Sequence, residues 1–358
     1  MAEFNLTLND DQLQIKEWIH QFAVEHIRPN AQEWDDREEF PWPVVQEAAK
    51  IGLYGIEFMM NAMSDPSGLT LPVAIEEIFW GDAGLGMAIM GSGLAAAGIT
   101  GNGTPEQIME WVPQCYGTAD DVKLGAFCVS EPDAGSDVAA MQTRAVQTLQ
   151  GWTLNGRKTW ISNGGIADFY CLFARTDDAP RGTSGISAFI VPTNTPGFSW
   201  TPITTVGDVK TTATYYSDVL VPKENVVGEV GKGYQVALAG LDTGRIGIAA
   251  QALGIAEAAL AEGVRYAKDR KAFGKRVADF QASQFAVADA RLDVAHAVEG
   301  AVETHAHARG HGNQLRHRLH VHLVIGGERA DDDAVHAEFL GDAPLQRGVV
   351  IGLVEAEH

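Results

Sequence analysis

The spacing of apolar residues changes twice along this chain of 358 residues, and that change limits the folds it can adopt. Up to about residue 120, apolar residues recur at three- and four-residue steps, the period of an amphipathic helix. From Lys123 the period becomes two, which is typical of strands, and helical spacing returns after Gly233. We therefore expect an α+β protein of several layers: an N-terminal helical domain, a central small β-barrel or sheet domain, and a C-terminal helical bundle that is incomplete.

Capping and turn residues predict the individual elements. Asn9 and Asp10 can cap a first helix that Pro29 would end, and Thr104-Pro105 can start another before Val112. Asn155-Gly156 is the strongest hairpin-turn signal in the chain. We expect helices over 44–51, 72–80 and 83–100, from 233 past 266 and over 279–297, and strands over 124–129, 152–154, 157–161, 169–174, 185–191 and 213–220.

Composition excludes several classes of function. A chain that is 46% hydrophobic and 20% charged folds into a globular protein. Its net charge of -21 repels nucleic acids and anionic membrane surfaces, so we expect neither as a partner. Three cysteines without paired spacing and a polar start predict a cytoplasmic protein with buried thiols. The residues around Cys128 favour a small buried hydrophobe over a nucleophile.

The stretch from Leu124 to Asp137 joins an apolar run to a polar turn, and loops of this kind commonly carry function. Gly135 permits backbone conformations that other residues avoid, while Ser130 and Ser136 offer hydroxyl groups on either side of the turn. An anionic or polar ligand would fit there. The alternative is an ordinary strand and turn.

Four strings in this order resemble the acyl-CoA dehydrogenase family of flavoproteins, and the resemblance, closest to short-chain members, covers about residues 5–296. The strings are Phe127–Pro132 with Gly135–Asp137, Trp160–Gly164, Leu241–Ala249, and Asp269–Lys275 with Phe280-Gln281. The resemblance implies FAD as the cofactor, acyl-CoA as the substrate and electron-transferring flavoprotein as the electron acceptor. It also implies a homodimer or homotetramer.

The resemblance assigns site residues in two groups. Trp160 would offer the flavin ring a flat apolar wall, with a core aromatic as the alternative. Arg245 would hold a polar part of the ligand, with an internal salt bridge to Asp242 as the alternative. Cofactor contacts are expected from Phe127, Cys128, Val129, Ser130, Ser136, Trp160, Ile161 and Ser162, and, across a subunit boundary, from Arg270, Phe273 and Gln281. Substrate contacts are expected from Ser136, Asp242, Thr243, Gly244 and Arg245.

The implied reaction is FAD-dependent α,β-dehydrogenation of an acyl-CoA thioester to the 2-enoyl-CoA. It requires a carboxylate that removes the α proton, in most members the glutamate of a Tyr-Glu-Gly-Thr string. The chain contains no such string, and Gly244 occupies the position used by a minority of members. The catalytic residue is therefore unassigned. Two alternatives stay open: a truncated or frameshifted chain that binds flavin or acyl-CoA without catalysis, and a related acyl-CoA oxidase or nitroalkane oxidase.

Composition changes sharply near residue 298, which sets the last of four predicted domains: 1–120, 121–232, 233–297 and the tail 298–358. Nine of the eleven histidines lie at or after His296, and no lysine follows Lys275. We interpret the tail as the product of a shifted reading frame. Its histidines follow no recognised zinc spacing, so no metal site is expected, although His305 with His307 and His320 with His322 are candidate pairs.

Overall fold

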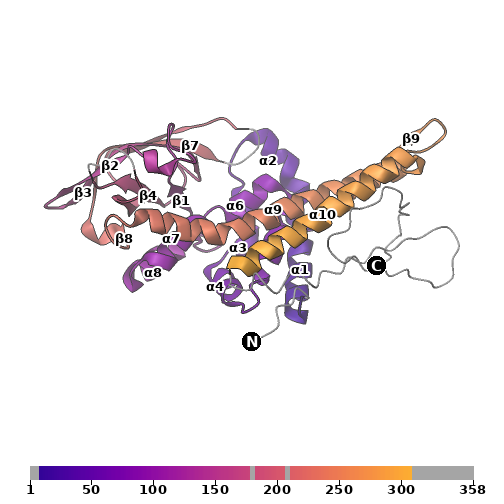
Figure 1. Cartoon of the computed structure of the whole chain (residues 1–358), viewed down its shortest axis with the longest axis horizontal. Coiled ribbons are helices and arrows are strands. Elements are labelled where there is room, and N and C mark those ends of the chain that lie inside the picture. The colour runs from indigo at the N-terminus through magenta and orange to yellow at the C-terminus, as the bar shows by residue number, and fades with distance from the viewer. Residues whose placement is uncertain (1–7, 178–181, 206–209, 309–358) are drawn as a thin grey trace. The chain divides into compact units, whose positions relative to one another are not determined.

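The structure, a computed structural model, describes residues 8–177, 182–205 and 210–308. The side chains of residues 242, 243 and 296–308 lie outside this description, as does the predicted tail from residue 309 onward. The chain divides into two compact units, one over residues 8–248 and one that includes 249–308. Helices come first, strands follow and helices return, which confirms the predicted α+β class (Figure 1).

The first helices are placed by local signals that the sequence contains. Asn9 and Gln12 form a reciprocal capping box, in which each side chain accepts a hydrogen bond from the other residue's backbone N–H, at 3.0 and 2.9 Å. Thr104 and Gln107 form a second box at the predicted start near Pro105. The helices of this layer are α1 (Asp10–Phe22), η1 (Ala23–Ile27), η2 (Arg28–Asn30), α2 (Ala31–Arg37), α3 (Trp42–Lys50), α4 (Ile56–Ser64), α5 (Thr70–Gly81), α6 (Ala83–Met90), α7 (Gly93–Asn102), α8 (Pro105–Trp111) and η3 (Pro113–Cys115).

Pro29 does not end the first helical segment, so that prediction is wrong. The regular α-helix stops at Phe22, and the chain continues through the π-helical turn η1 and the 3-10 turn η2 into α2. Pro29 is the second residue of η2, near the start of a short turn, where its missing N–H is not needed. The helical path therefore changes its winding instead of stopping.

The apolar run over 83–100 forms two helices, α6 and α7, where a single helix was predicted. They separate at Gly91-Ser92, and the buried Ser92 hydroxyl accepts a hydrogen bond from the Gly125 backbone N–H at 3.1 Å. The segments Ala83–Asn102 and Gly233–Asp269 are each long and apolar enough to cross a membrane, a test that buried core helices also pass. Half of the apolar window in the first segment is buried.

The central layer is one eight-stranded sheet. Its strands run in the order β6-β7-β3-β2-β4-β5-β8, and β1 pairs with β4 in parallel. Every residue of β4 is buried, and α7 packs against β1 and β4 (Figure 1). The elements of this layer are β1 (Gly125–Cys128), η4 (Val138–Ala140), β2 (Arg144–Thr148), β3 (Gly151–Ser162), β4 (Phe169–Arg175), β5 (Ile186–Pro192), β6 (Phe198–Pro202), β7 (Thr211–Val221), η5 (Lys223–Asn225) and β8 (Val226–Val227).

The hairpin predicted at Asn155-Gly156 does not exist. Both residues lie inside β3, which pairs with β7 on one side and β2 on the other. Gly156, with φ of 152°, forms an irregularity in the β3–β7 register, and Asn155 accepts from the Asp218 backbone N–H at 2.9 Å. An Asn-Gly pair supports a tight turn only when the flanking strands pair with each other. Here pairing with β7, some sixty residues away in sequence, determines the conformation.

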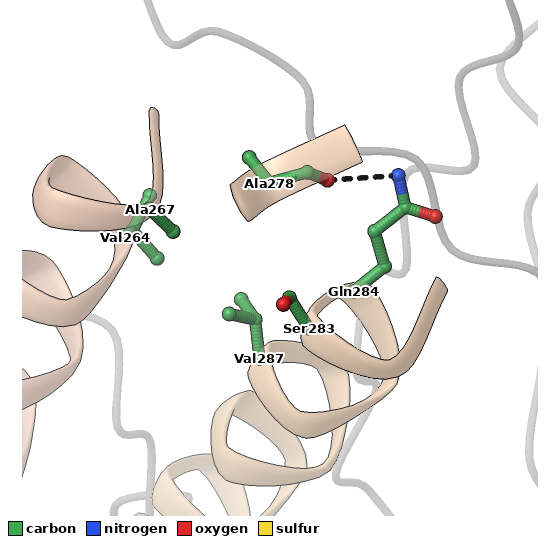
Figure 2. Close-up of a pocket in the computed structure, with 6 residues that line it drawn as sticks. All are labelled: Val264, Ala267, Ala278, Ser283, Gln284 and Val287. Carbon is green, nitrogen blue, oxygen red and sulfur yellow. Dashed lines mark hydrogen bonds between the residues drawn. The ribbon is translucent and has the colours of Figure 1, made fainter. Parts of the chain in front are cut away.

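The second unit is a helical hairpin. It contains the later part of α9 (Gly233–Asp269), β9 (Lys271–Ala272), β10 (Lys275–Arg276), η6 (Val277–Asp279) and α10 (Gln281–Ala308). A small cavity of about 10 Å³ lies between the end of α9 and the start of α10, where Gln284 donates to the Ala278 carbonyl oxygen (Figure 2). That volume holds about one water molecule, so neither a flavin nor an acyl chain fits this cavity.

Gly156→Ala is expected to lower the free energy of unfolding by about 1–3 kcal/mol. A Cβ at this position would lie 2.5 Å from the Thr143 Oγ1 atom, on a backbone with φ of 152°. Gly263→Ala is the matched control, since nothing lies within 4 Å of its Cβ position in α9, and it should raise stability by about 0.5–1 kcal/mol. Chemical denaturation of both variants tests this. Equal stability of Gly156→Ala and wild type would contradict the assigned backbone constraint.

Candidate functional site

The candidate site begins where β1 ends. The half-buried ring of Phe127 meets the edge of Phe173 at a centroid separation of 5.0 Å. Cys128 is fully buried, and burial raises the pKa of its thiol to about 12. The thiol is therefore protonated at neutral pH, as expected for a small buried hydrophobe. Val129 is also buried, so the side chains of Cys128 and Val129 leave little surface for a ligand.

The loop after β1 opens toward solvent. Ser130 is half-buried, and a short bridge between Glu131 and Ala134 closes a tight turn. Gly135 and Ser136 follow in exposed positions, and nothing lies within 4 Å of a Cβ placed on Gly135. The backbone of this turn is therefore free to approach a ligand closely.

An ion pair beneath the loop ties it to β3. The Lys158 Nζ atom lies 2.9 Å from the Glu131 Oε1 atom and 3.0 Å from the Val129 carbonyl oxygen. Glu131 also accepts from the backbone N–H groups of Gln142 and Thr143, at 2.7 and 2.9 Å. Burial alone would raise the pKa of Glu131, but the Lys158 ammonium and these donors hold that pKa below its usual range.

Trp160 lies two residues beyond this lysine and is 63% exposed. Its φ is 59°, in the left-handed region that bulky residues avoid, and it lies at a register irregularity in β3. The preceding Thr159 donates its backbone N–H to the Ser130 carbonyl oxygen at 3.0 Å. The structure thus brings the loop and the tryptophan together, and Trp160 is not the core aromatic of the alternative interpretation.

The residues after Trp160 fix this strand to β1. Ile161 is buried and Ser162 is half-buried. Asn163 is also buried, has a φ of 61° and donates from Nδ2 to the Gly125 carbonyl oxygen at 3.2 Å. The second string of the sequence analysis therefore lies beside the first, as a two-part ligand site requires.

Sequence reasoning missed the charged residues that hold the loop. Besides Lys158 and Glu131, the buried Arg175 donates to the carbonyl oxygens of Met141, Ala139 and Gly182, at 3.2, 2.9 and 3.0 Å. Arg175 thereby anchors the distal end of the same loop. The sequence contains a signal of burial for Arg175, a cation at the end of an otherwise apolar strand, whereas Lys158 lies between Arg157 and Thr159 and is not marked as buried by its neighbours.

Apart from Ser136 in the loop after β1, the predicted substrate residues lie on α9 within the first unit. A Cβ on Gly244 would meet the Leu94 side chain of α7 at 3.4 Å, and a Cβ on Gly240 would lie 3.9 Å from the backbone of Gly98 and Leu94. Arg245 is exposed. The side chains of Asp242 and Thr243 lie outside the described residues, so the salt bridge between Asp242 and Arg245 stays an open alternative.

The remaining predicted cofactor residues belong to the second unit. Phe273 occupies the turn between β9 and β10, is 97% exposed and has a φ of 51°. Arg270 and Gln281 are exposed on the flanking segments. An exposed aromatic ring on a left-handed backbone is costly for an isolated chain, so this turn is suited to contact another molecule.

Family models of the acyl-CoA dehydrogenase N-terminal, middle and C-terminal domains match residues 9–117, 126–219 and 231–327. The short-chain-specific acyl-CoA dehydrogenase of Megasphaera elsdenii is 39% identical over 302 residues, which cover 82% of this chain and 77% of that protein. The Caffeyl-CoA reductase-Etf complex subunit CarC of Acetobacterium woodii is 39% identical over 265 residues, 72% of this chain and 68% of that protein.

A solved structure supports the same relationship. The butyryl-CoA dehydrogenase from Megasphaera elsdenii superposes with a TM-score of 0.78 at 35% sequence identity. The match covers 87% of this chain and 84% of the solved chain. It therefore includes both the helical layers and the sheet that carries the candidate site.

Glu131→Gln is expected to lower the free energy of unfolding by about 3–5 kcal/mol at neutral pH, because the substitution leaves the Lys158 ammonium buried without its counter-charge. A carboxyl with a lowered folded-state pKa stabilises the fold above its unfolded pKa of about 4.3 and loses that contribution as pH falls through the folded value. The difference between variant and wild type should therefore shrink below about pH 4. Denaturation curves across this range test it, and a constant difference would contradict the ion pair.

Proposed function

This chain belongs to the acyl-CoA dehydrogenase family, and we propose that it binds FAD and a short-chain acyl-CoA for oxidation of the bond between the α and β carbons. The preference for a short acyl chain rests on the short-chain-specific and butyryl-CoA relatives. The exposed ring of Trp160, held on a strained backbone beside Ser130, is the observation that carries the proposal.

The residues of the site fit a flavin. Trp160 offers an exposed flat face for an aromatic ring system, and Ser130 and Ser162 offer hydroxyl groups to its polar edge. The half-buried Phe127 of β1 adds an apolar side chain beside the loop. When bound, FAD supplies an acceptor for the hydride that leaves the β carbon of the substrate.

The acyl-CoA would lie between the loop and α9. Exposed Ser136 can donate a hydrogen bond to a polar group of the ligand, and exposed Arg245 can interact with one of its anionic groups. Gly244 leaves room beside Leu94 of α7, because a Cβ there would make only ordinary contact at 3.4 Å. These residues would bind and orient the substrate.

A second function is favoured by two features of the 358-residue sequence together: it contains no Tyr-Glu-Gly-Thr string, and position 244 is a glycine. The alternative base position of the family lies immediately before Arg245, and α9 offers no carboxylate there. A chain without a base would bind flavin and acyl-CoA without rapid dehydrogenation. The two functions differ in whether the bound acyl-CoA reduces the flavin.

Electron-transferring flavoprotein is the proposed electron acceptor, supported by the relative named as a subunit of an Etf complex. We also propose a homo-oligomer in which the exposed Phe273, Arg270 and Gln281 reach the flavin of a second copy. Their exposure supports this arrangement. The three cysteines are free and buried, as expected for the proposed cytoplasmic location.

Anaerobic titration of the purified holoprotein with butyryl-CoA separates the two functions: if the chain lacks a base, the acyl-CoA is expected to bind while visible flavin absorbance is lost only slowly. Gly244→Glu places a carboxylate at the alternative base position and should speed that loss by at least about a hundredfold. Gly244→Gln is the matched control, since it has the same shape without the base. Rapid bleaching of the wild type would favour the intact dehydrogenase, and a protein that cannot hold FAD would refute the proposed function.

Phe273→Ala is expected to weaken FAD binding about tenfold and to shift the protein toward smaller assemblies, because the lost ring would no longer contact the partner's flavin. Equilibrium dialysis with FAD and size-exclusion chromatography measure the two effects. Leu149→Ala is the control, since it removes another fully exposed apolar side chain far away in the sequence. Unchanged FAD affinity in Phe273→Ala would contradict the proposed contact.

A further inference from the structure

Lys158 is a fully buried cation in the middle of a β-strand, and its ammonium group has a defined set of partners. Its Nζ atom donates to the Val129 carbonyl oxygen and to the Glu131 carboxylate. We propose that Lys158, with Glu131, is a positioning residue for the proposed flavin site: it sets the spacing between Ser130 in the loop and Trp160 on β3. This inference rests on the proposed function.

The contacts of Lys158 join two segments that are distant in sequence. Val129 and Glu131 flank Ser130 in the loop, while Lys158 lies on β3, two residues before Trp160. One ammonium therefore binds both residues that flank Ser130, Val129 through its backbone carbonyl and Glu131 through its carboxylate. Thr159 adds a backbone hydrogen bond to the Ser130 carbonyl oxygen at 3.0 Å. Ser130 and Trp160 are fixed relative to each other by these three hydrogen bonds.

Stability alone is a weak reason for this arrangement. Removing two charges from water costs as much as or more than their attraction returns, and well-packed apolar pairs often replace buried ion pairs without loss. An ion pair specifies direction and distance in a way that an apolar contact does not. Three polar donors converge on Glu131, which leaves this part of the loop little freedom to move.

The position of Lys158 excludes direct contact with a ligand. Its side chain has no exposed surface, whereas the Trp160 ring is 63% exposed. Lys158 would therefore affect a ligand only through the loop residues that it binds, Val129 and Glu131. The strained backbone at Trp160, with φ of 59°, requires a rigid surrounding, and the ion pair directly precedes it.

The test compares four variants of the holoprotein: Lys158→Met, Glu131→Gln, the double variant Lys158→Met/Glu131→Gln, and Glu77→Gln. Glu77 is the matched control, because it is a buried carboxylate that binds a lysine, Lys16, at 2.9 Å between α1 and α5. For each protein, three quantities are measured: the dissociation constant for FAD, the visible spectrum with the midpoint potential of the bound flavin, and the free energy of unfolding. The double variant removes both charges, so it stays folded even where a single variant leaves a buried charge unpaired.

We expect the Lys158 and Glu131 variants, the double variant included, to raise the FAD dissociation constant by about tenfold and to shift the flavin spectrum and potential. Glu77→Gln should lower stability without changing either flavin measurement. If wild type holds FAD and the double variant keeps the same affinity, spectrum and potential, the positioning role is overturned while the proposed function stands. If wild type does not bind FAD, the proposed function is refuted and this inference falls with it.

Discussion

The buried contact between Lys158 and Glu131 is the interaction on which the candidate site depends. It joins the loop after β1 to the second half of β3, and these two segments supply the exposed Trp160 and the half-buried Ser130. The sheet provides the frame, because β4 is buried along its whole length and β1 pairs with it. The loop receives a backbone hydrogen bond from Thr159 of β3 instead of a regular ladder, so charged side chains supply much of its attachment.

Sequence patterns predicted the order of the helical and β layers correctly. They failed for elements whose conformation depends on contacts between residues distant in sequence. The capping boxes at Asn9 and Thr104 placed two helix starts correctly, because a cap depends on residues three positions apart. Asn155-Gly156 was misassigned, since its conformation follows from pairing between β3 and β7. The division between α6 and α7 depends on Ser92 binding β1, a contact that local periodicity does not contain.

The residues of the candidate site likewise fall into those that the sequence identified and those that it did not. Resemblance identified the exposed Trp160 and Phe273, whose backbone conformations and exposure set them apart from core aromatics. It missed Lys158, Glu131 and Arg175, because a charged residue in a sequence is assumed to face water unless its partner is known. Their partners lie 27 residues apart for the first pair and 36 for the most distant Arg175 contact. Only the folded chain reveals them.

The bulged strand β3 also restricts how related sequences can diverge. Side chains alternate between the two faces of a strand, so inserting or deleting one residue between Gly156 and Lys158 would turn Lys158 away from the loop. Trp160 is exposed although it lies two residues beyond the buried Lys158, because the register is irregular between Lys158 and Ile161, so a change in length there would alter its direction too. Substitutions preserve this register, whereas changes in length do not. We therefore expect the number of residues between these positions to be the same among relatives, even where their side chains differ.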